Sequence, residues 1–156
     1  MLAMQTTWDG LPVAREQPYA CCVVVWRQSG RGREFLVLHR LAPGGAGYEG
    51  DWAWTPPSGA RLPGETPDAA AARELHEETS LALDLVALPE AAPSEDVAVY
   101  VAEAPAGAEI DLDDEHDRFL WLPLEESVPK CLPAAVAACL VNASAWLDAR
   151  AGAERS

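Results

Sequence analysis

Runs of apolar, β-branched residues alternate along the chain with turn-forming segments, and they predict a series of short strands. Residues 19–28 (YACCVVVWRQ) have the pattern of a buried strand, and residues 34–41 (EFLVLHRL) predict a second one. The turn sequence SGRGRE lies between them, so we expect a hairpin. Residues 51–57 (DWAWTPP) are expected to be short and extended, with Trp52 and Trp54 on one face.

Helix signals are strongest just before the middle of the chain. Thr66 suits the N-cap, Pro67 suits the first helical position, and the alanines that follow have high helix propensity, so we expect a helix that ends near Thr79 and Ser80. Further strands are expected in residues 81–88, 96–104 and 118–124, loops in residues 58–65 and 107–117, and a C-terminal helix in residues 132–147. This order indicates an α/β fold with helices packed on a mixed sheet.

One domain accounts for most of the chain. A length of 156 residues is enough for a single buried core, and the sequence shows no repeat and no linker. We expect the domain to occupy residues 18–148. Residues 1–17 are expected to form a loose arm or a covering segment, and residues 149–156 a frayed tail.

Charge restricts the partners. With 25 acidic and 11 basic residues the net charge is −14, which argues against binding to DNA, RNA or an anionic membrane. An anionic substrate would need a bound cation to mediate the contact. No signal peptide or membrane span is apparent, and the four cysteines show no metal-binding spacing, so we expect a soluble cytoplasmic protein with reduced, buried thiols. Cys21 and Cys22 are adjacent and are expected to point to opposite faces of a strand.

A cluster of glutamates lies on the predicted helix of residues 66–79. Each helical residue turns about 100°, so the side chains of Glu74, Glu77 and Glu78 fall within an arc of roughly 100°. A different face, formed by Ala72, Leu75 and Thr79, is expected to pack on the sheet. Three neighbouring carboxylates repel one another, and a hard divalent cation such as Mg²⁺ would relieve this repulsion. The alternative for the cluster alone is a solvated acidic face.

The wider spacing favours the cation site. Residues 59–81 resemble the Nudix box, G-x5-E-x7-R-E-U-x-E-E-x-G-U, in which U is a bulky aliphatic residue. The matching positions are Gly59, Glu65, Arg73, Glu74, Leu75, Glu77, Glu78 and Leu81. Ser80 departs from the box, because the family has glycine there. Glycine eases a left-handed turn at a helix exit, so we expect a small loss of stability and no loss of chemistry.

The resemblance spans about residues 18–148 and implies the Nudix fold, an α/β/α sandwich with a mixed sheet. It implies a pyrophosphohydrolase that cleaves a nucleoside diphosphate linked to another group by attack of water on phosphorus. Glu74, Glu77 and Glu78 would then bind Mg²⁺ or Mn²⁺.

The resemblance also implies roles for residues around the glutamates. A backbone carbonyl near Ser58 or Gly59 would contribute to the metal site. Arg73 would pair with Glu65 and hold the glutamates in place.

Residues outside the box are candidates for secondary roles. Glu115, in the acidic loop, corresponds to a loop glutamate that joins the metal site or acts as general base in Nudix enzymes, whereas a solvated loop is the alternative. His116 is weighed beside it, with an exposed, inactive histidine as the simpler expectation. Arg40 would contact a substrate phosphate, since guanidinium groups match phosphate oxygens, whereas an exposed arginine at the end of a strand is the simpler alternative. Stacking on a nucleobase is the candidate role of Tyr48, Trp52 and Trp54, although at least one tryptophan is expected to be buried.

Two segments resemble the diadenosine tetraphosphate hydrolases in particular, WTPPSGARLPGE and EHDRFLWLPLEE. Ser58 replaces the lysine of that group, and the link between Leu88 and Val97 lacks its basic, tyrosine-bearing segment. Dihydroneopterin triphosphate and nucleoside triphosphate pyrophosphohydrolases therefore stay as alternatives. A catalytically idle nucleotide-binding module and an acidic protein that binds Ca²⁺ nonspecifically are the alternatives outside enzymology.

Overall fold

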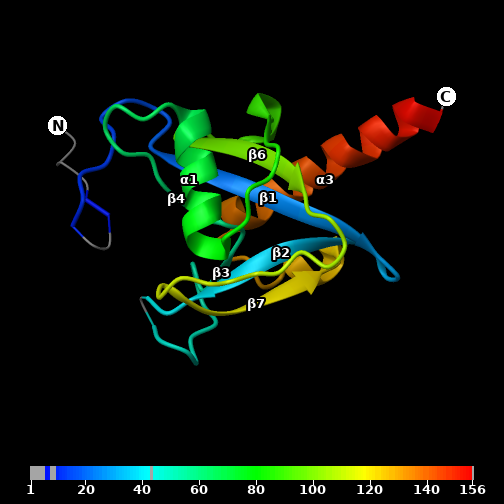
Figure 1. Cartoon of the computed structure of the whole chain (residues 1–156), viewed down its shortest axis with the longest axis horizontal. Helices are drawn as coiled ribbons and strands as arrows, with labels where there is room; N and C mark the ends of the chain where they lie inside the picture. The colour runs from blue at the N-terminus through cyan, green and yellow to red at the C-terminus, as the bar shows by residue number, and fades with distance from the viewer. Residues whose placement is uncertain (1–5, 8–9, 43, 156) are drawn as a thin grey trace.

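The computed structural model describes residues 6–7, 10–42 and 44–155, and its centre is one mixed β-sheet (Figure 1). The strands are β1 (Ala20–Ser29), β2 (Gly32–Arg40), β3 (Trp54–Thr55), β4 (Ser58–Ala60), β5 (Val86–Ala87), β6 (Val97–Glu103) and β7 (His116–Leu122). The helices are α1 (Pro67–Thr79), η1 (Pro89–Ala91), a 3-10 turn, α2 (Leu124–Ser127) and α3 (Ala134–Arg155).

The sheet has the strand order β3-β2-β1-β6-β5, with β4 also pairing with β1 and β7 with β2. The predicted hairpin of β1 and β2 is antiparallel, and β1 runs parallel to β6, so the sheet is mixed as expected. The start of β1 pairs with β4, with Cys21 opposite Gly59. The end of β2 pairs with the start of β7, with Arg40 opposite His116.

Two layers of buried residues, one on each face of the sheet, make the expected α/β/α sandwich. Alternating residues of β1 divide between them, and Cys21 and Cys22 point to opposite faces as predicted. Residues of α1, including Ala71 and Leu75, fill one layer, and residues of α3, including Leu140, fill the other. Figure 1 shows α1 in front of the strands and α3 behind them. All four cysteines are buried and free.

Local signals in the sequence account for the bounds of α1. The Thr66 hydroxyl accepts a hydrogen bond from the Ala69 amide at 3.1 Å, which is the N-cap arrangement that was expected. At the other end Ser80 adopts a left-handed conformation, with φ 65°, and its amide donates to the His76 carbonyl at 2.8 Å. The Ser80 hydroxyl donates to the Asp111 carbonyl at 3.1 Å, a bond that glycine could not make.

Several sequence expectations about local structure are wrong. Trp52 and Trp54 do not share a face, because Trp52 has φ 66° and interrupts the alternation, leaving it 49% exposed while Trp54 is buried. Residues 58–65 are not entirely a loop, since β4 pairs there with β1. Of residues 81–88 only Val86 and Ala87 form a strand.

Both ends of the chain also differ from expectation. Residues 149–155 continue α3 where a frayed tail was expected, because Ala, Arg and Glu favour helix. The described part of the N-terminal arm packs against the domain: Val13 and Ala14 are buried, and the Ala14 amide donates to the Arg61 carbonyl at 2.7 Å. This part is a covering segment, whereas residues 1–5 and 8–9 of the predicted arm lie outside the described residues. Within the described residues, no helix combines the length and apolar character needed to span a bilayer.

Candidate active site

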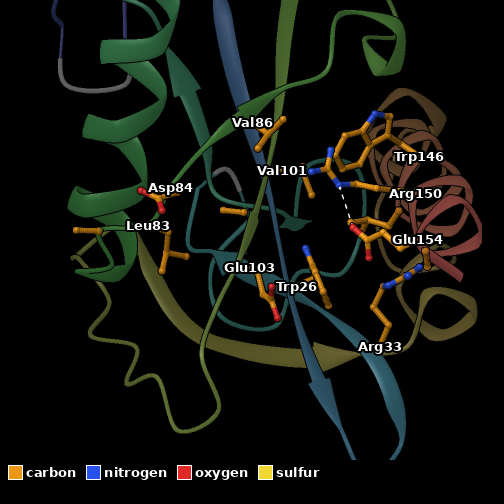
Figure 2. Close-up of a pocket in the computed structure, with 14 residues that line it drawn as sticks. Trp26, Arg33, Leu83, Asp84, Val86, Val101, Glu103, Trp146, Arg150 and Glu154 are labelled. Carbon is orange, nitrogen blue, oxygen red and sulfur yellow. Dashed lines mark ion pairs between the residues drawn. The ribbon is translucent and has the colours of Figure 1, made fainter.

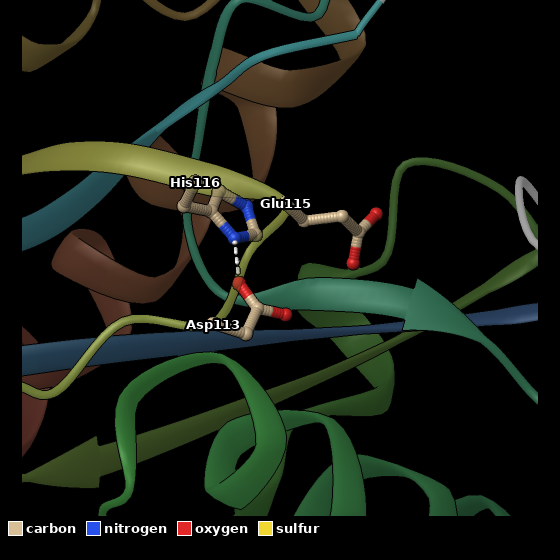
Figure 3. Close-up of side chains that lie close together, drawn as sticks. All are labelled: Asp113, Glu115 and His116. Carbon is tan, nitrogen blue, oxygen red and sulfur yellow. Dashed lines mark hydrogen bonds and ion pairs between the residues drawn. The ribbon is translucent and has the colours of Figure 1, made fainter.

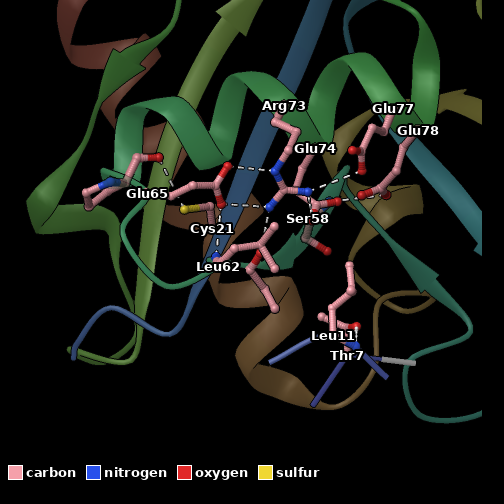
Figure 4. Close-up of polar contacts among 12 residues, drawn as sticks. Thr7, Leu11, Cys21, Ser58, Leu62, Glu65, Arg73, Glu74, Glu77 and Glu78 are labelled. Atoms are coloured by element: carbon pink, nitrogen blue, oxygen red, sulfur yellow. Dashed lines mark hydrogen bonds and ion pairs between the residues drawn. The ribbon is translucent and has the colours of Figure 1, made fainter. Parts of the chain in front are cut away.

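Arg73 organises the acidic face of α1 (Figure 4). Its guanidinium forms a bidentate ion pair with Glu65, with Nε–Oε2 at 2.7 Å and Nη2–Oε1 at 2.9 Å. It also donates to the Ala60 carbonyl at 3.0 Å, to Glu74 at 2.9 Å and to Glu77 at 3.2 Å. Hydrogen bonds from Arg73 lower the pKa of Glu65, and those to Glu65 raise the pKa of Arg73, so this pair stays ionised. The pair ties α1 to β4 through Ala60.

The three box glutamates differ sharply in burial. The exposed fraction of the side chain is 57% for Glu77, 12% for Glu74 and 1% for Glu78. They therefore do not form the solvated face that a charge run predicts. The expected core face is also wrong in one position, because Ala72 is exposed while Leu75, Thr79 and Glu78 itself are buried.

Burial of Glu74 and Glu78 perturbs both carboxyls. Loss of solvation raises the pKa of Glu78 well above its ordinary value, and hydrogen bonding and repulsion from Glu74 raise it further. Burial also raises the pKa of Glu74. The Ser58 amide donates to Glu78 Oε1 at 3.4 Å, whereas Glu78 Oε2 is buried without a hydrogen-bond partner among the described residues. Two carboxyls in contact under these conditions hold a proton between them unless a cation replaces it.

A pocket of about 310 Å³ opens over this pair. Its lining includes the predicted site residues Arg40, Ser58, Gly59, Arg73, Glu74, Glu77 and Glu115. Glu78 lies behind this lining. Gly59 is required for the approach of β4 to α1, because a Cβ at this position would collide with the Glu74 carboxylate.

Arg40 brings positive charge to the pocket. Its Nη2 donates to the Ser58 carbonyl and to Ser58 Oγ, each at 3.2 Å, while its Nε is buried without a hydrogen-bond partner among the described residues. The end of β2 therefore holds a guanidinium beside the buried carboxyls. Arg40 lies outside the box, so the spacing of the box does not predict this contact.

The acidic loop before β7 also borders the pocket, and one of its residues, His116, differs from expectation (Figure 3). Glu115 lines the pocket as expected. His116 was expected to be exposed, but its side chain is 0% exposed; it begins β7, where that strand pairs with Arg40 of β2. Its Nδ1 donates to Asp113 at 2.7 Å and its Nε2 lies 3.4 Å from Glu78 Oε1. Burial lowers the pKa of His116.

None of the three expected stacking residues, Tyr48, Trp52 and Trp54, lines the pocket of the glutamates, and Trp54 is buried. The Tyr48 ring is packed tightly between Gly44 and Gly50, where a Cβ on either glycine would collide with it. Trp52 is half exposed, and its amide donates to the Leu132 carbonyl at 2.6 Å. Thr7 and Leu11 of the N-terminal arm line the pocket instead. Nothing in the pattern of residues 1–17 pointed to that position.

A second pocket, of about 640 Å³, lies at the other end of the sheet against the C-terminal part of α3 (Figure 2). Its two guanidinium groups stack on indoles, Arg33 over Trp26 at 5.6 Å and Arg150 over Trp146 at 4.9 Å. Each is also paired with an acid, Arg33 with Asp148 and Arg150 with Glu154. Both guanidinium groups here are already paired with acids, so we take the pocket beside Glu74 as the candidate active site.

Comparison with known proteins indicates the family and the fold. A family model described as NUDIX domain matches residues 16–145. The structure is similar to a diadenosine tetraphosphate (Ap4A) hydrolase from Caenorhabditis elegans, with 26% identity, a TM-score of 0.68 and coverage of 83% of this chain and 97% of that one. It shares its fold with the Nudix hydrolase RenU of Mycobacterium smegmatis, with 18% identity, a TM-score of 0.66 and coverage of 92% and 93%.

Two further proteins extend the comparison. The dihydroneopterin triphosphate pyrophosphohydrolase of Escherichia coli has the same fold, with 18% identity, a TM-score of 0.61 and coverage of 81% of this chain and 94% of that one. An octanoyltransferase from Myxococcus xanthus is 36% identical over 112 residues, which take in 65% of this chain and 30% of that protein. The chain thus corresponds to less than a third of that relative. The family model, which covers most of the chain, and the fold agree: the chain belongs to the Nudix hydrolase family.

Proposed function

We propose that this Nudix pyrophosphohydrolase uses Mg²⁺ or Mn²⁺ to cleave a phosphoanhydride in a nucleotide-type substrate, and that dinucleoside polyphosphates are its preferred class. One observation carries the proposal. Glu74 and Glu78 are buried in contact, each with a raised pKa, next to the guanidinium of Arg40. Burial of two acids in contact opposes folding, so such a pair is a candidate functional site.

The donor set fits a divalent cation. Glu78 Oε2 has no hydrogen-bond partner among the described residues, and Gly59 leaves space only for the Glu74 carboxylate. Oxygen ligands of this kind are the ones that Mg²⁺ and Mn²⁺ accept. We assign Glu74, Glu78 and the Gly59 carbonyl as inner ligands, with Glu77 and Glu115 at the rim of the pocket. Bound ions would neutralise phosphate charge and polarise the attacking water.

The remaining residues of the site position these groups. Arg73, fixed by Glu65, holds the Glu74 carboxylate in one orientation through its bond at 2.9 Å. Glu115 faces the same pocket from the opposite wall and accepts the proton of the attacking water. Arg40 lines the pocket, and its guanidinium donates to a non-bridging phosphate oxygen.

Arg40 also bears on the substrate class. Ser58 stands where the diadenosine tetraphosphate hydrolases have lysine, and the Arg40 guanidinium lies 3.2 Å from Ser58 Oγ. The site thus keeps a cation at this point, supplied by a neighbouring strand. Ser58 positions that cation. The C. elegans Ap4A hydrolase is the relative of highest TM-score among those described above, which favours the same class here.

The two nucleosides of such a substrate extend beyond a pocket of about 310 Å³. Leu11, 47% exposed, offers an apolar wall for the base nearer the glutamates. Trp52 is the exposed aromatic that we assign to the distal base, whereas the tightly packed Tyr48 contributes by shaping the loop.

A substrate panel tests the proposal. The purified chain is incubated with Mg²⁺ and diadenosine tetraphosphate, nucleoside triphosphates, sugar nucleotides or dihydroneopterin triphosphate, and products are separated by chromatography. We expect the highest kcat/KM for the dinucleotide, and hydrolysis in H₂¹⁸O identifies the phosphorus attacked. Glu78→Gln is expected to lose activity, and Glu125→Gln, at an exposed position on α2, serves as the matched control. If the unaltered protein and Glu78→Gln bind nucleotide equally well and neither hydrolyses it, the protein is an idle binding module.

A further inference from the structure

His116 is a buried histidine whose surroundings differ from those of an ordinary core residue. It is the first residue of β7, opposite Arg40 of β2, and its side chain is fully buried. Its Nε2 atom has no hydrogen-bond partner among the described residues, although it lies 3.4 Å from Glu78 Oε1. A buried polar atom without a partner normally indicates a missing ligand, ion or water.

The hydrogen bond on the other side of the ring determines which nitrogen is available. Nδ1 donates to Asp113 Oδ1 at 2.7 Å, so in the neutral ring Nε2 carries the lone pair. This lone pair faces Glu78 Oε1 at 3.4 Å, and the second Glu78 oxygen is also unpartnered. Two acceptors buried face to face are stable only when a cation or a proton lies between them.

The spacing of these atoms suits two ligands of one metal ion. Ligands bound at about 2.1 Å, with an angle of about 90–110° at the metal, are separated by about 3.0–3.4 Å. The carboxylate of Asp113 behind the ring completes a carboxylate–histidine–metal arrangement, which fixes the ring and its tautomer. Glu115 lies close by, since ligand atoms of Asp113, Glu115 and His116 all fall within 4.8 Å of one another.

We propose that His116 Nε2 is a direct ligand of a divalent ion that it shares with Glu78, and that this nitrogen makes the site prefer Mn²⁺ to Mg²⁺. Imidazole is a good ligand for transition metals and a poor one for Mg²⁺, which takes oxygen. The proposal rests on the metal site of the proposed function and adds a ligand outside the glutamate cluster.

Pulsed electron paramagnetic resonance on the Mn²⁺-loaded protein tests this directly. Coordination by imidazole produces ¹⁴N modulation of the Mn²⁺ echo, and growth with ¹⁵N-histidine shifts its frequencies in the unaltered chain. His116→Gln is expected to abolish the modulation while offering an amide oxygen in its place. His76→Gln, at an exposed position of α1, is the matched control and should keep it.

Metal affinities measured by calorimetry give a second readout. For His116→Gln we expect Mn²⁺ affinity to fall about tenfold or more, with the affinity for Mg²⁺ changed less than about threefold. Absence of ¹⁴N modulation in the unaltered chain, its persistence in His116→Gln, or an equal loss of both affinities would overturn the proposal. Mg²⁺-dependent hydrolysis by the unaltered chain is scored separately, so failure of the histidine ligand and failure of the proposed function are distinguishable.

Discussion

Glu78→Gln should make the metal-free protein more stable while it disables the enzyme. The side chain of Glu78 is 1% exposed and its carboxyl contacts that of Glu74. Glutamine has nearly the same shape but no charge, so it removes both the desolvation of an ionised group and the repulsion from Glu74. Loss of a metal ligand should lower kcat by about 10²-fold or more, since metal ions contribute several kcal/mol of transition-state stabilisation.

The size of the stability gain follows from the raised pKa of Glu78. Its folded-state pKa lies well above the ordinary value of 4.5, so the folded protein holds a proton that the unfolded chain releases. Its contribution to stability is therefore fully present below pH 4.5 and is lost as pH rises toward the folded-state pKa. The loss is about 1.4 kcal/mol per pH unit within that window. At pH 7.5 we expect Glu78→Gln to raise the free energy of unfolding by about 1–3 kcal/mol.

Thermal and urea denaturation in EDTA at pH 5 and pH 7.5 measure this effect. Each kcal/mol corresponds to about 2–4 °C in Tm for a chain of this size. The difference between variant and wild type should grow with pH. Glu77→Gln removes the same charge from the exposed side of α1 and should change stability by less than about 0.5 kcal/mol. The reasoning is refuted if Glu78→Gln is less stable than wild type at pH 7.5, or if saturating Mg²⁺ stabilises both chains equally.

Three other substitutions probe the rest of the site. Gly59→Ala places a Cβ against the Glu74 carboxylate, so calorimetry should show that the affinity for Mg²⁺ falls about tenfold or more. An unchanged affinity would contradict this packing. Arg73→Lys cannot form the bidentate pair with Glu65, so kcat should fall, and the free energy of unfolding from urea denaturation should fall by about 1–2 kcal/mol. Full activity would show that the pair does not position Glu74. Arg40→Met should raise KM for the dinucleotide about tenfold with folding intact, and an unchanged KM would remove Arg40 from the phosphate site.

Features that depend on local sequence were predicted well. The bounds of α1 follow from Thr66, Pro67 and the alanines, because capping and helix propensity act within a few residues. Strands β1 and β2 follow from β-branched runs separated by a tight turn. Four residues of the box, Gly59, Arg73, Glu74 and Glu77, line one pocket.

Features set by contacts between distant segments were not predicted. Strand β4 has only three residues and no pattern of its own, since it exists by pairing with β1. Trp52 escapes period-two alternation because its backbone is left-handed. His116 is buried because β7 lies beside β2, and a loop of acids gave no sign of that pairing. Alternation along the strand does not reveal it either. The pairing of β7 with β2 shifts register between His39 and Arg40, so the inward parity of Phe119 and Trp121 does not extend to His116.

The most direct test of the central claim is anomalous diffraction from crystals soaked in Mn²⁺. The account predicts a Mn²⁺ peak in contact with both Glu74 and Glu78, beside the Gly59 carbonyl. A protein that binds Mn²⁺ elsewhere, with Glu74 and Glu78 still sharing a proton and no ion between them and the pocket, would contradict it.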